Sequence, residues 1–305
     1  MVLRRATYAG SWYPGSRKGL QDALKEYFTD EKFGPGEEPL TMNKDERTIL
    51  GGVSPHASMT YSGPCAAFTY LNLFKERIPD TVVVLGTDHI GYHKIALMKE
   101  GEWETPLGNL EIDEELSKEI LNNSKIIEAD NSLFTGRTAE QEHNIEIQLP
   151  FIKYCSHDKE VKIVPIKIAG TREFKKMNTI AADIAKAINS SNKDIIIIAS
   201  SDMSHKEVRD SNQLKIFKEI DLAVIKEFKN LNPEKTLEAA LKTTVCGPQT
   251  ITTMMLICQN LSATRGEMMQ YYTSSERTGS IGGYCVGYFS GIIKRSTPLH
   301  SSIAE

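Results

Sequence analysis

The sequence lacks the features by which composition reveals a membrane or secreted protein. No apolar run approaches the roughly 18 residues that a helix needs to cross a bilayer. The first residues, Met1–Arg5, lead into polar and aromatic residues instead of the apolar core of a secretory signal. Cysteine is scarce: there are five, an odd number, and no two form a Cys-x-x-Cys pair. We therefore expect free thiols and a cytoplasmic protein.

Charge and motif content exclude several further classes. Lys and Arg number 36 against 40 Asp and Glu, giving a net charge of −4, and the basic residues are scattered along the chain. Neither a nucleic acid nor a membrane surface is therefore an expected partner. The sequence also has no Walker loop, no Gly-x-Gly-x-x-Gly after a strand, no Gly-x-Ser-x-Gly elbow and no His-Glu-x-x-His. Its chemistry must come from another arrangement.

What the sequence does contain is an alternation of short β-branched runs with helical patterns. Such runs, bounded by turn residues, are typical of strands buried in a parallel sheet, and they occur at Thr48–Val53, Val82–Leu85 and Ile195–Ala199. Strands are also expected around 94–98, 109–112, 161–168 and 282–293, the third with Pro165 favouring an edge position or a bulge. Helices are expected at 17–28, near 63–76, at 113–122, 172–189, 211–229, 234–242 and 248–261. The pattern predicts a single α/β domain over residues 1–305, a three-layer sandwich with a mainly parallel central sheet and a frayed tail at 294–305.

Three of the predicted strands each lead into a histidine, namely His56, His89 and His205. Ligands of open α/β sheets bind outside the carboxyl ends of the strands. We expect His56 and His89 just beyond adjacent strands of one β-α-β unit. Each alone would be an ordinary loop histidine, but their repetition favours a metal or acid–base site.

Two other residues can complete that site. Cys246 lies just before the helix expected at 248–261, where the helix dipole would lower the thiol pKa and favour a thiolate ligand for iron, zinc or Cu(I). The alternative is a small buried hydrophobic side chain, as we expect for the other four cysteines. Asp202 lies three residues before His205 and could orient its imidazole; alternatively it only caps the turn.

A further polar cluster contains Glu142, His143 and Glu146. On a helix the two glutamates would share a face, with His143 beside Glu146. These residues could contact and support the metal ligands, or they could form an ordinary helix surface.

In these residues the chain resembles the MEMO family, which is widespread in archaea and bacteria. Five blocks match in order, and together with a sixth around the cysteine they span nearly the whole chain. The blocks are Ala9–Pro14, Pro55–Ala57 with Tyr61–Gly63, Leu85–His89, Glu142–His143 with Gln148–Phe151, Ser200–Asp202 with Ser204–His205, and Val245–Gly247.

The resemblance implies a fold and a ligand set. The MEMO family is similar to the class III extradiol ring-cleaving dioxygenases, which hold non-haem Fe(II) with two His and one Glu. It implies His56 and His89 as the two histidine ligands, Cys246 in place of the carboxylate and His205 as the acid–base histidine. A single divalent metal is implied, with iron as the expected ion and zinc or copper as alternatives. Microbial members are encoded beside a radical-SAM protein, which implies a shared pathway.

Three functions follow from this pattern. The first is a metal-dependent oxidoreductase acting on an unknown small molecule, with His205 and Asp202 moving a proton. The second is a non-catalytic module that binds a peptide or partner protein in the same pocket, as one animal member of the family does with phosphotyrosine peptides. The third, zinc-dependent hydrolysis, ranks last because no carboxylate is expected beside the ligands as general base.

Overall fold

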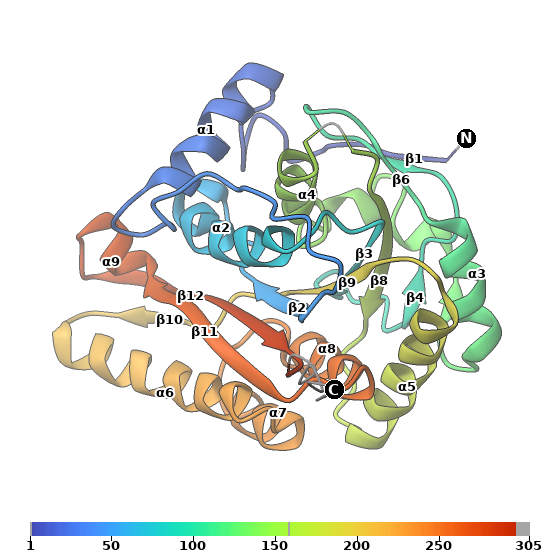
Figure 1. The fold of residues 1–305 in the computed structure, drawn as a ribbon. Helices are drawn as coiled ribbons and strands as arrows, with labels where there is room; N and C mark the ends of the chain where they lie inside the picture. Colours follow the sequence, from blue (N-terminus) through green and yellow to red (C-terminus); the bar gives the residue numbers. More distant parts are fainter. Residues whose placement is uncertain (1, 158, 297–305) are drawn as a thin grey trace, which may run out of the picture.

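A computed structural model describes residues 2–157 and 159–296 of the chain (Figure 1). The predicted tail at 294–305 lies outside the described residues from 297 onward, and Lys294 itself ends a strand instead of fraying. None of the described helices is both long enough and apolar enough to span a membrane.

A nine-stranded sheet forms the centre of the molecule, and its middle is parallel. The four middle strands are paired in the order β2 (Ile49–Ser54), β9 (Ile195–Ser200), β3 (Thr81–Thr87) and β8 (Lys162–Ile168). Nearly every residue of these β-branched runs is buried, as expected for strands covered on both faces. Antiparallel pairing begins on both sides of this group, so the sheet as a whole is mixed.

The remaining strands extend the two edges. Beside β2 lie β12 (Gly283–Lys294), β11 (Arg265–Thr273) and β10 (His205–Val208), and beside β8 lie β4 (Ala96–Leu97) and β7 (Glu128–Ala129). A separate small sheet contains β1 (Leu3–Arg4), β5 (Glu102–Trp103) and β6 (Leu110–Glu111).

Helices cover both faces of the sheet (Figure 1). One hydrophobic cluster joins the sheet to α1 (Arg17–Thr29), α2 (Met59–Lys75) and α4 (Leu149–Cys155). A second cluster, on the other face, includes side chains of α3 (Glu114–Asn123), α5 (Phe174–Ser190), α6 (Ser211–Lys229), α7 (Pro233–Ala240) and α8 (Pro248–Asn260). A short helix, α9 (Ser274–Thr278), precedes β12. The α/β sandwich predicted from the sequence is confirmed in this form.

The order of the central strands corrects one expectation. β2 and β3 are not neighbours, because β9 is inserted between them and pairs with both. The β2-α2-β3 unit therefore crosses over one strand, and the segment that follows β9 emerges between the segments that carry His56 and His89. Sequence distance concealed this insertion, since β9 comes more than 100 residues after β3.

Pro165 does not make β8 an edge strand, because β8 is paired on both sides. Its carbonyl oxygen accepts a hydrogen bond from the Met98 N–H at 3.3 Å, so its nitrogen also faces β4. The paired residues of β4 are only Ala96 and Leu97, opposite Lys167 and Ile166. The missing N–H of the proline thus falls where β4 needs no donor.

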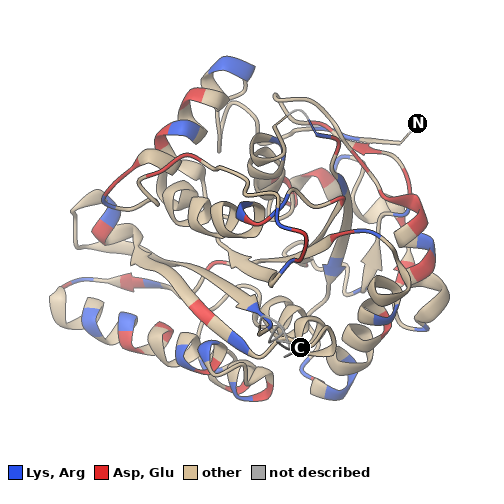
Figure 2. Cartoon of the chain, viewed as in Figure 1, with Lys and Arg blue, Asp and Glu red and all other residues tan. Residues whose placement is uncertain are grey.

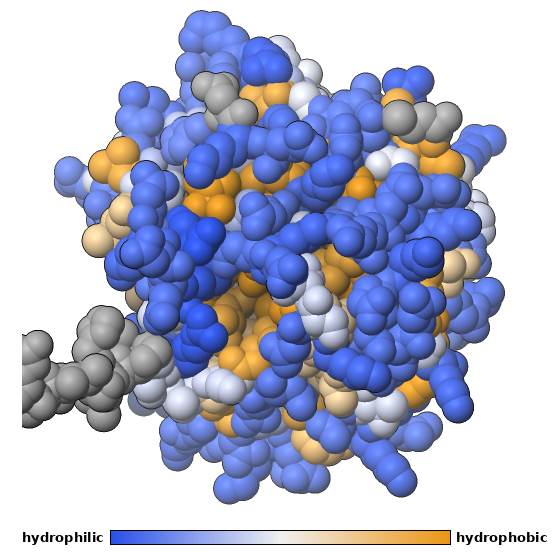
Figure 3. All heavy atoms as spheres, turned by 45° about the vertical axis from the view of Figure 1, so that its right-hand side comes forward, coloured by the Kyte–Doolittle hydropathy of each residue, from blue (hydrophilic) through white to orange (hydrophobic). Residues whose placement is uncertain are grey.

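Charges of both signs are interspersed over the outer helices (Figure 2). Most of the face seen in Figure 3 is hydrophilic, and hydrophobic residues show mainly in recesses between polar ones. The central strands β2, β3 and β9 contain no Lys, Arg, Asp or Glu.

Candidate metal centre

Three neighbouring strands each place a polar residue two positions beyond their last paired residue. β2 ends at Ser54 and is followed by His56, β9 ends at Ser200 and is followed by Asp202, and β3 ends at Thr87 and is followed by His89. Ser54 lies opposite Ser200 in the parallel register, so these ends are level. The carboxyl edge of the sheet therefore gathers two imidazoles and a carboxylate, as the position of ligand sites in such sheets predicts.

The tautomer of His56 is fixed by a chain of hydrogen bonds through Ser200. The Ser200 hydroxyl donates to the Asn144 carbonyl at 2.7 Å and accepts from the Gln148 side-chain amide at 2.8 Å. The same amide donates to the Pro55 carbonyl at 3.0 Å, which fixes its orientation. Since the single proton of Ser200 is already used, His56 Nδ1 must donate to Ser200 Oγ across their 3.0 Å contact. His56 Nε2 is left with its lone pair free.

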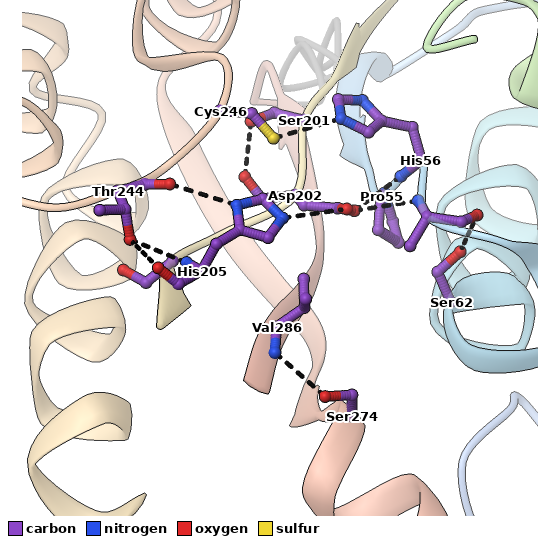
Figure 4. A network of polar contacts seen from close by, with 12 residues as sticks. Pro55, His56, Ser62, Ser201, Asp202, His205, Thr244, Cys246, Ser274 and Val286 are labelled. Atoms are coloured by element: carbon purple, nitrogen blue, oxygen red, sulfur yellow. Dashed lines mark hydrogen bonds and ion pairs between the residues drawn. The ribbon is translucent and has the colours of Figure 1, made fainter. Parts of the chain in front are cut away.

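That lone pair faces Cys246. The distance from His56 Nε2 to Cys246 Sγ is 3.2 Å, and Figure 4 shows the two side chains pointing toward one another from β2 and from the segment before α8. Ligands that lie about 2.0–2.3 Å from one metal are separated by a similar distance. All five cysteines are free; Cys246 is partly exposed, and the other four are buried, as expected.

His89 has the same arrangement with a carboxylate as acceptor. Glu142 accepts from the His89 backbone N–H at 2.8 Å and contacts His89 Nδ1 at 2.9 Å. The Asn144 side-chain amide donates to the same carboxylate at 2.6 Å and to the Thr87 carbonyl at 2.8 Å. A carboxylate accepts only, so Nδ1 of His89 carries a proton, and Nε2 is the nitrogen through which His89 would bind a metal. Such carboxylate–histidine contacts orient metal ligands in proteins.

The segment that carries Glu142, His143 and Glu146 is not the continuous helix considered from the sequence. Glu142 is extended, and a short 3₁₀ helix begins only at Glu146. The two glutamates consequently face different partners instead of sharing a face. Glu146 forms a fully buried ion pair with Arg4 at 3.1 Å and accepts from the Tyr8 N–H and the Tyr13 hydroxyl, each at 2.8 Å.

His143 lies in the centre itself. Its ring centroid is 5.2 Å from that of His56 and 5.0 Å from that of His89. Trp12 covers it at 4.4 Å, so the tryptophan of the first family block packs against this centre.

The carboxylate of Asp202 connects His56 to His205 (Figure 4). It accepts from the backbone N–H of His56 at 2.8 Å and of Ala57 at 3.3 Å, and its other oxygen lies 3.6 Å from His205 Nε2. His205 Nδ1 is 3.3 Å from the Thr244 carbonyl, which requires a proton on that nitrogen. The expected pairing of Asp202 with His205 is therefore present.

Among the described residues there are two groups of potential metal ligands, and both include His56. Within each group, the ligand atoms all lie within 4.8 Å of one another. One consists of His56, His89 and His143, and the other of His56, Asp202 and Cys246. The ligands expected from the sequence are thus divided between the two groups. The second group also places the Asp202 carboxylate beside the ligands. Zinc-dependent hydrolysis ranks last from the sequence because no such carboxylate is expected there, and that expectation is wrong. The carboxylate is, however, already engaged by the backbone N–H groups of His56 and Ala57.

Burial determines the protonation of most of these groups. It lowers the pKa of His56 to about 3 and that of His143 to about 4, so both imidazoles are neutral at neutral pH, as metal ligation requires. Burial would raise the pKa of Glu142, but the hydrogen bonds that Glu142 accepts from the side chain and backbone of His89 lower it to about 2.

Cys246 is partly exposed as a residue, but its thiol lies deep in the centre, and this desolvation overturns the expectation for it. It raises the pKa of the thiol well above its ordinary value, although the thiol precedes helix α8. The helix dipole does not outweigh desolvation here, so the free thiol is protonated and a metal must displace its proton.

His205 and Asp202 shift in opposite directions. Burial lowers the pKa of His205, but the neighbouring Asp202 carboxylate outweighs it and the pKa is raised. Burial raises the pKa of Asp202, and the adjacent imidazoles and backbone N–H groups bring it below its ordinary value.

Sequence reasoning assigned no role to Ser200, Asn144 and Gln148, which fix both imidazoles. The available signal was their position: Ser200 and Gln148 belong to blocks that match the family, and Asn144 lies between two predicted supporting residues.

Comparison with known proteins agrees with the resemblance in those blocks. A sequence profile described as Memo-like protein matches residues 4–292. A protein of Methanobrevibacter smithii named MEMO1 family protein is 32% identical over 96% of this chain and 100% of its own length. Proteins with the same name from Nitrosopumilus maritimus and Desulfurococcus amylolyticus are 33% and 34% identical, over 93% and 94% of this chain and 98% of their own lengths.

Proposed function

The chain belongs to the Memo-like protein family, and we propose that it is an oxidoreductase that holds one divalent metal at the carboxyl edge of its sheet. The proposed ligands are His56, His89 and Cys246. The observation that carries the proposal is that Ser200 and Glu142 accept hydrogen bonds from Nδ1 of the two histidines, which leaves Nε2 of each ring as the nitrogen that can bind a metal.

The donor set fits a transition metal. Imidazole nitrogens and a thiolate are ligands for iron, zinc or copper but not for magnesium or calcium, which prefer oxygen. Iron is the ion we propose, because few protein ligands with open positions are typical of non-haem iron sites. When bound, such an ion supplies Lewis acidity and one-electron redox chemistry. The parallel strands that end at a two-histidine site also support our proposal of a class III extradiol dioxygenase-like fold.

We propose that His205 carries the proton that the reaction requires. Both of its ring nitrogens face acceptors, the Thr244 carbonyl and the Asp202 carboxylate, and this favours the protonated ring. Asp202 orients the ring, and its hydrogen bonds from His56 and Ala57 fix the carboxylate in turn. A positioned acid of this kind contributes about 10²–10⁴-fold to a rate.

Metal analysis after anaerobic purification tests the proposal. We expect about one equivalent of iron in the purified protein, since a single centre is proposed. His56→Ala and His89→Ala should lose this metal, whereas His157→Ala, which changes an exposed histidine, should retain it. A protein that takes up no stoichiometric iron, zinc or copper, or His56→Ala and His89→Ala variants that bind metal normally, would contradict the proposal.

A further inference from the structure

His143 is the histidine of the centre whose ring nitrogens have no other use. Among the residues that the structure describes, no hydrogen bond involves its imidazole, whereas the rings of His56 and His89 each have a partner at Nδ1. Its environment is nevertheless specific. Trp12 lies 4.4 Å from the ring of His143 and Tyr8 lies 5.7 Å from it, both measured between centroids. The ring is therefore held in place with its nitrogens available.

The three imidazoles are arranged around a common point. The rings of His89 and His143 are stacked with an interplanar angle of 12°, and the ring of His56 stands at 84° to each of them. One ligand nitrogen from each lies within 4.8 Å of the other two. An ion bound to all three would have to bring these nitrogens to a bonding distance of about 2.0–2.1 Å.

The group on the other side of His56 has fewer free donors. The Asp202 carboxylate already accepts from two backbone N–H groups and faces His205. Cys246 would contribute a thiolate ligand, and in that group His56 is the one other residue with a ligand atom that is not already engaged by the backbone. Of the nitrogens available for ligation in the three-imidazole group, only His56 Nε2 has a polar contact among the described residues, with the Cys246 thiol at 3.2 Å.

We infer that His56, His89 and His143 form a three-imidazole metal site that retains a divalent ion without Cys246, which acts as an additional, exchangeable ligand. The inference rests on the proposed function, because both concern the same ion. It differs in making His143, and not Cys246, indispensable for binding that ion. Three imidazoles that leave positions open are a known catalytic arrangement for divalent ions. The cluster thus has one coordination mode with the thiolate and one without it.

Cobalt(II) is the probe that distinguishes these modes, because its visible spectrum reports the ligand field and a thiolate-to-cobalt band reports sulfur ligation. The apoprotein and its variants are titrated with cobalt(II) under anaerobic conditions against a competing chelator. We expect Cys246→Ser to lose the thiolate band, to keep one equivalent of cobalt and to lose affinity by no more than about 10-fold, the lower end for a supporting group. His143→Phe should lose more than about 100-fold in affinity, beyond the usual range for a supporting contact.

Two controls keep the outcome interpretable. His143→Phe retains an aromatic ring against Trp12, and an unchanged melting temperature of the apoprotein shows that its fold is intact. His157→Gln changes an exposed histidine and should bind cobalt like the unaltered protein.

The possible failures are distinguishable. If the unaltered protein binds neither cobalt nor iron, the proposed function fails and the inference fails with it. If His143→Phe binds cobalt as tightly as the unaltered protein, or if Cys246→Ser loses cobalt altogether, the inference is overturned while the proposed function stands.

Discussion

At the scale of single residues, the centre depends on hydrogen bonds that decide where protons reside. An imidazole can ligate a metal only through a nitrogen that carries no proton, so the group facing the other nitrogen determines its use. For His56 that group is Ser200, and for His89 it is Glu142. Neither contact follows from chain proximity, since each joins residues more than 50 positions apart.

Removing the Ser200 hydroxyl should therefore weaken metal binding. In Ser200→Ala, His56 Nδ1 loses its acceptor and the Asn144 carbonyl loses its donor. We expect a loss of about 10–100-fold in metal affinity and of about 1–3 kcal/mol in the free energy of unfolding. Chelator competition and urea unfolding measure the two effects.

Ser117→Ala is a matched control for this change. Ser117 is fully buried, and its hydroxyl has no hydrogen-bond partner within the described part of the chain. Its removal should leave metal affinity unchanged and cost little stability, because no buried partner is left unpaired. Equal effects of the two substitutions would refute the role assigned to Ser200.

At the scale of elements, the close approach of β3 to the segment that carries His143 positions the centre. Gly86 has ordinary extended geometry, so its lack of a side chain serves packing and not a left-handed turn. A Cβ atom at this position would lie 2.2 Å from Asn144 Oδ1 and 2.6 Å from Ile145 Cγ1. Asn144 and Ile145 therefore pack directly on the β3 backbone, beside the strand end that leads to His89.

Gly86→Ala should displace this segment. We expect the free energy of unfolding to fall by about 1–3 kcal/mol through overpacking, together with weaker metal binding because Glu142 and His143 shift with Asn144. Urea unfolding and cobalt titration test this prediction. Gly170→Ala is the control, because a Cβ atom there meets nothing within 4 Å and φ is not positive. A stable Gly86→Ala variant that binds metal normally would show that the segment adapts without cost.

At the scale of the whole molecule, a buried ion pair joins the amino-terminal residues to the centre. Arg4 and Glu146 have fully buried side chains and approach to 3.1 Å. Arg4 also donates to the backbone carbonyl oxygens of Glu140 at 3.1 Å and Glu142 at 3.0 Å. It therefore holds the backbone of Glu142, whose side-chain carboxylate contacts His89. Residues near the start of the chain thus hold a segment more than 130 positions away.

Arg4→Ala should destabilise the protein strongly. Loss of one partner leaves the Glu146 carboxylate buried without its cation, which typically costs about 3–5 kcal/mol. The double variant Arg4→Met/Glu146→Gln should recover part of this loss, because it removes both charges while the amide oxygen of the new glutamine side chain can still accept from the Tyr8 N–H and the Tyr13 hydroxyl. Urea unfolding of Arg4→Met, of Glu146→Gln and of the double variant gives the coupling between the two sites.

The exposed pair of Lys18 and Asp22 on α1 provides the comparison, and Asp22→Asn should have little effect because water screens such pairs. An Arg4→Ala variant no less stable than Asp22→Asn would show that the buried pair does not hold the fold together.

The sequence by itself determined most of the central elements and most of the residues at the centre. Hydrophobic periodicity is a local property, and it predicted the buried strands β2, β3 and β9 and the helices that flank them. Strand ends with polar residues predicted that His56, His89 and Asp202 would meet at one edge. The exposed, irregular pattern of β11 gave no such signal, and this strand was not predicted.

Only the tertiary structure decided the order of the strands and the partners of each side chain. The insertion of β9 between β2 and β3, the approach of His143 to the other imidazoles and the protonated state of Cys246 depend on contacts between distant segments. Burial in particular raises the pKa of the Cys246 thiol, although the dipole of helix α8 would lower it. Desolvation is a property of the assembled surroundings, and a pattern read along the chain contains no measure of it.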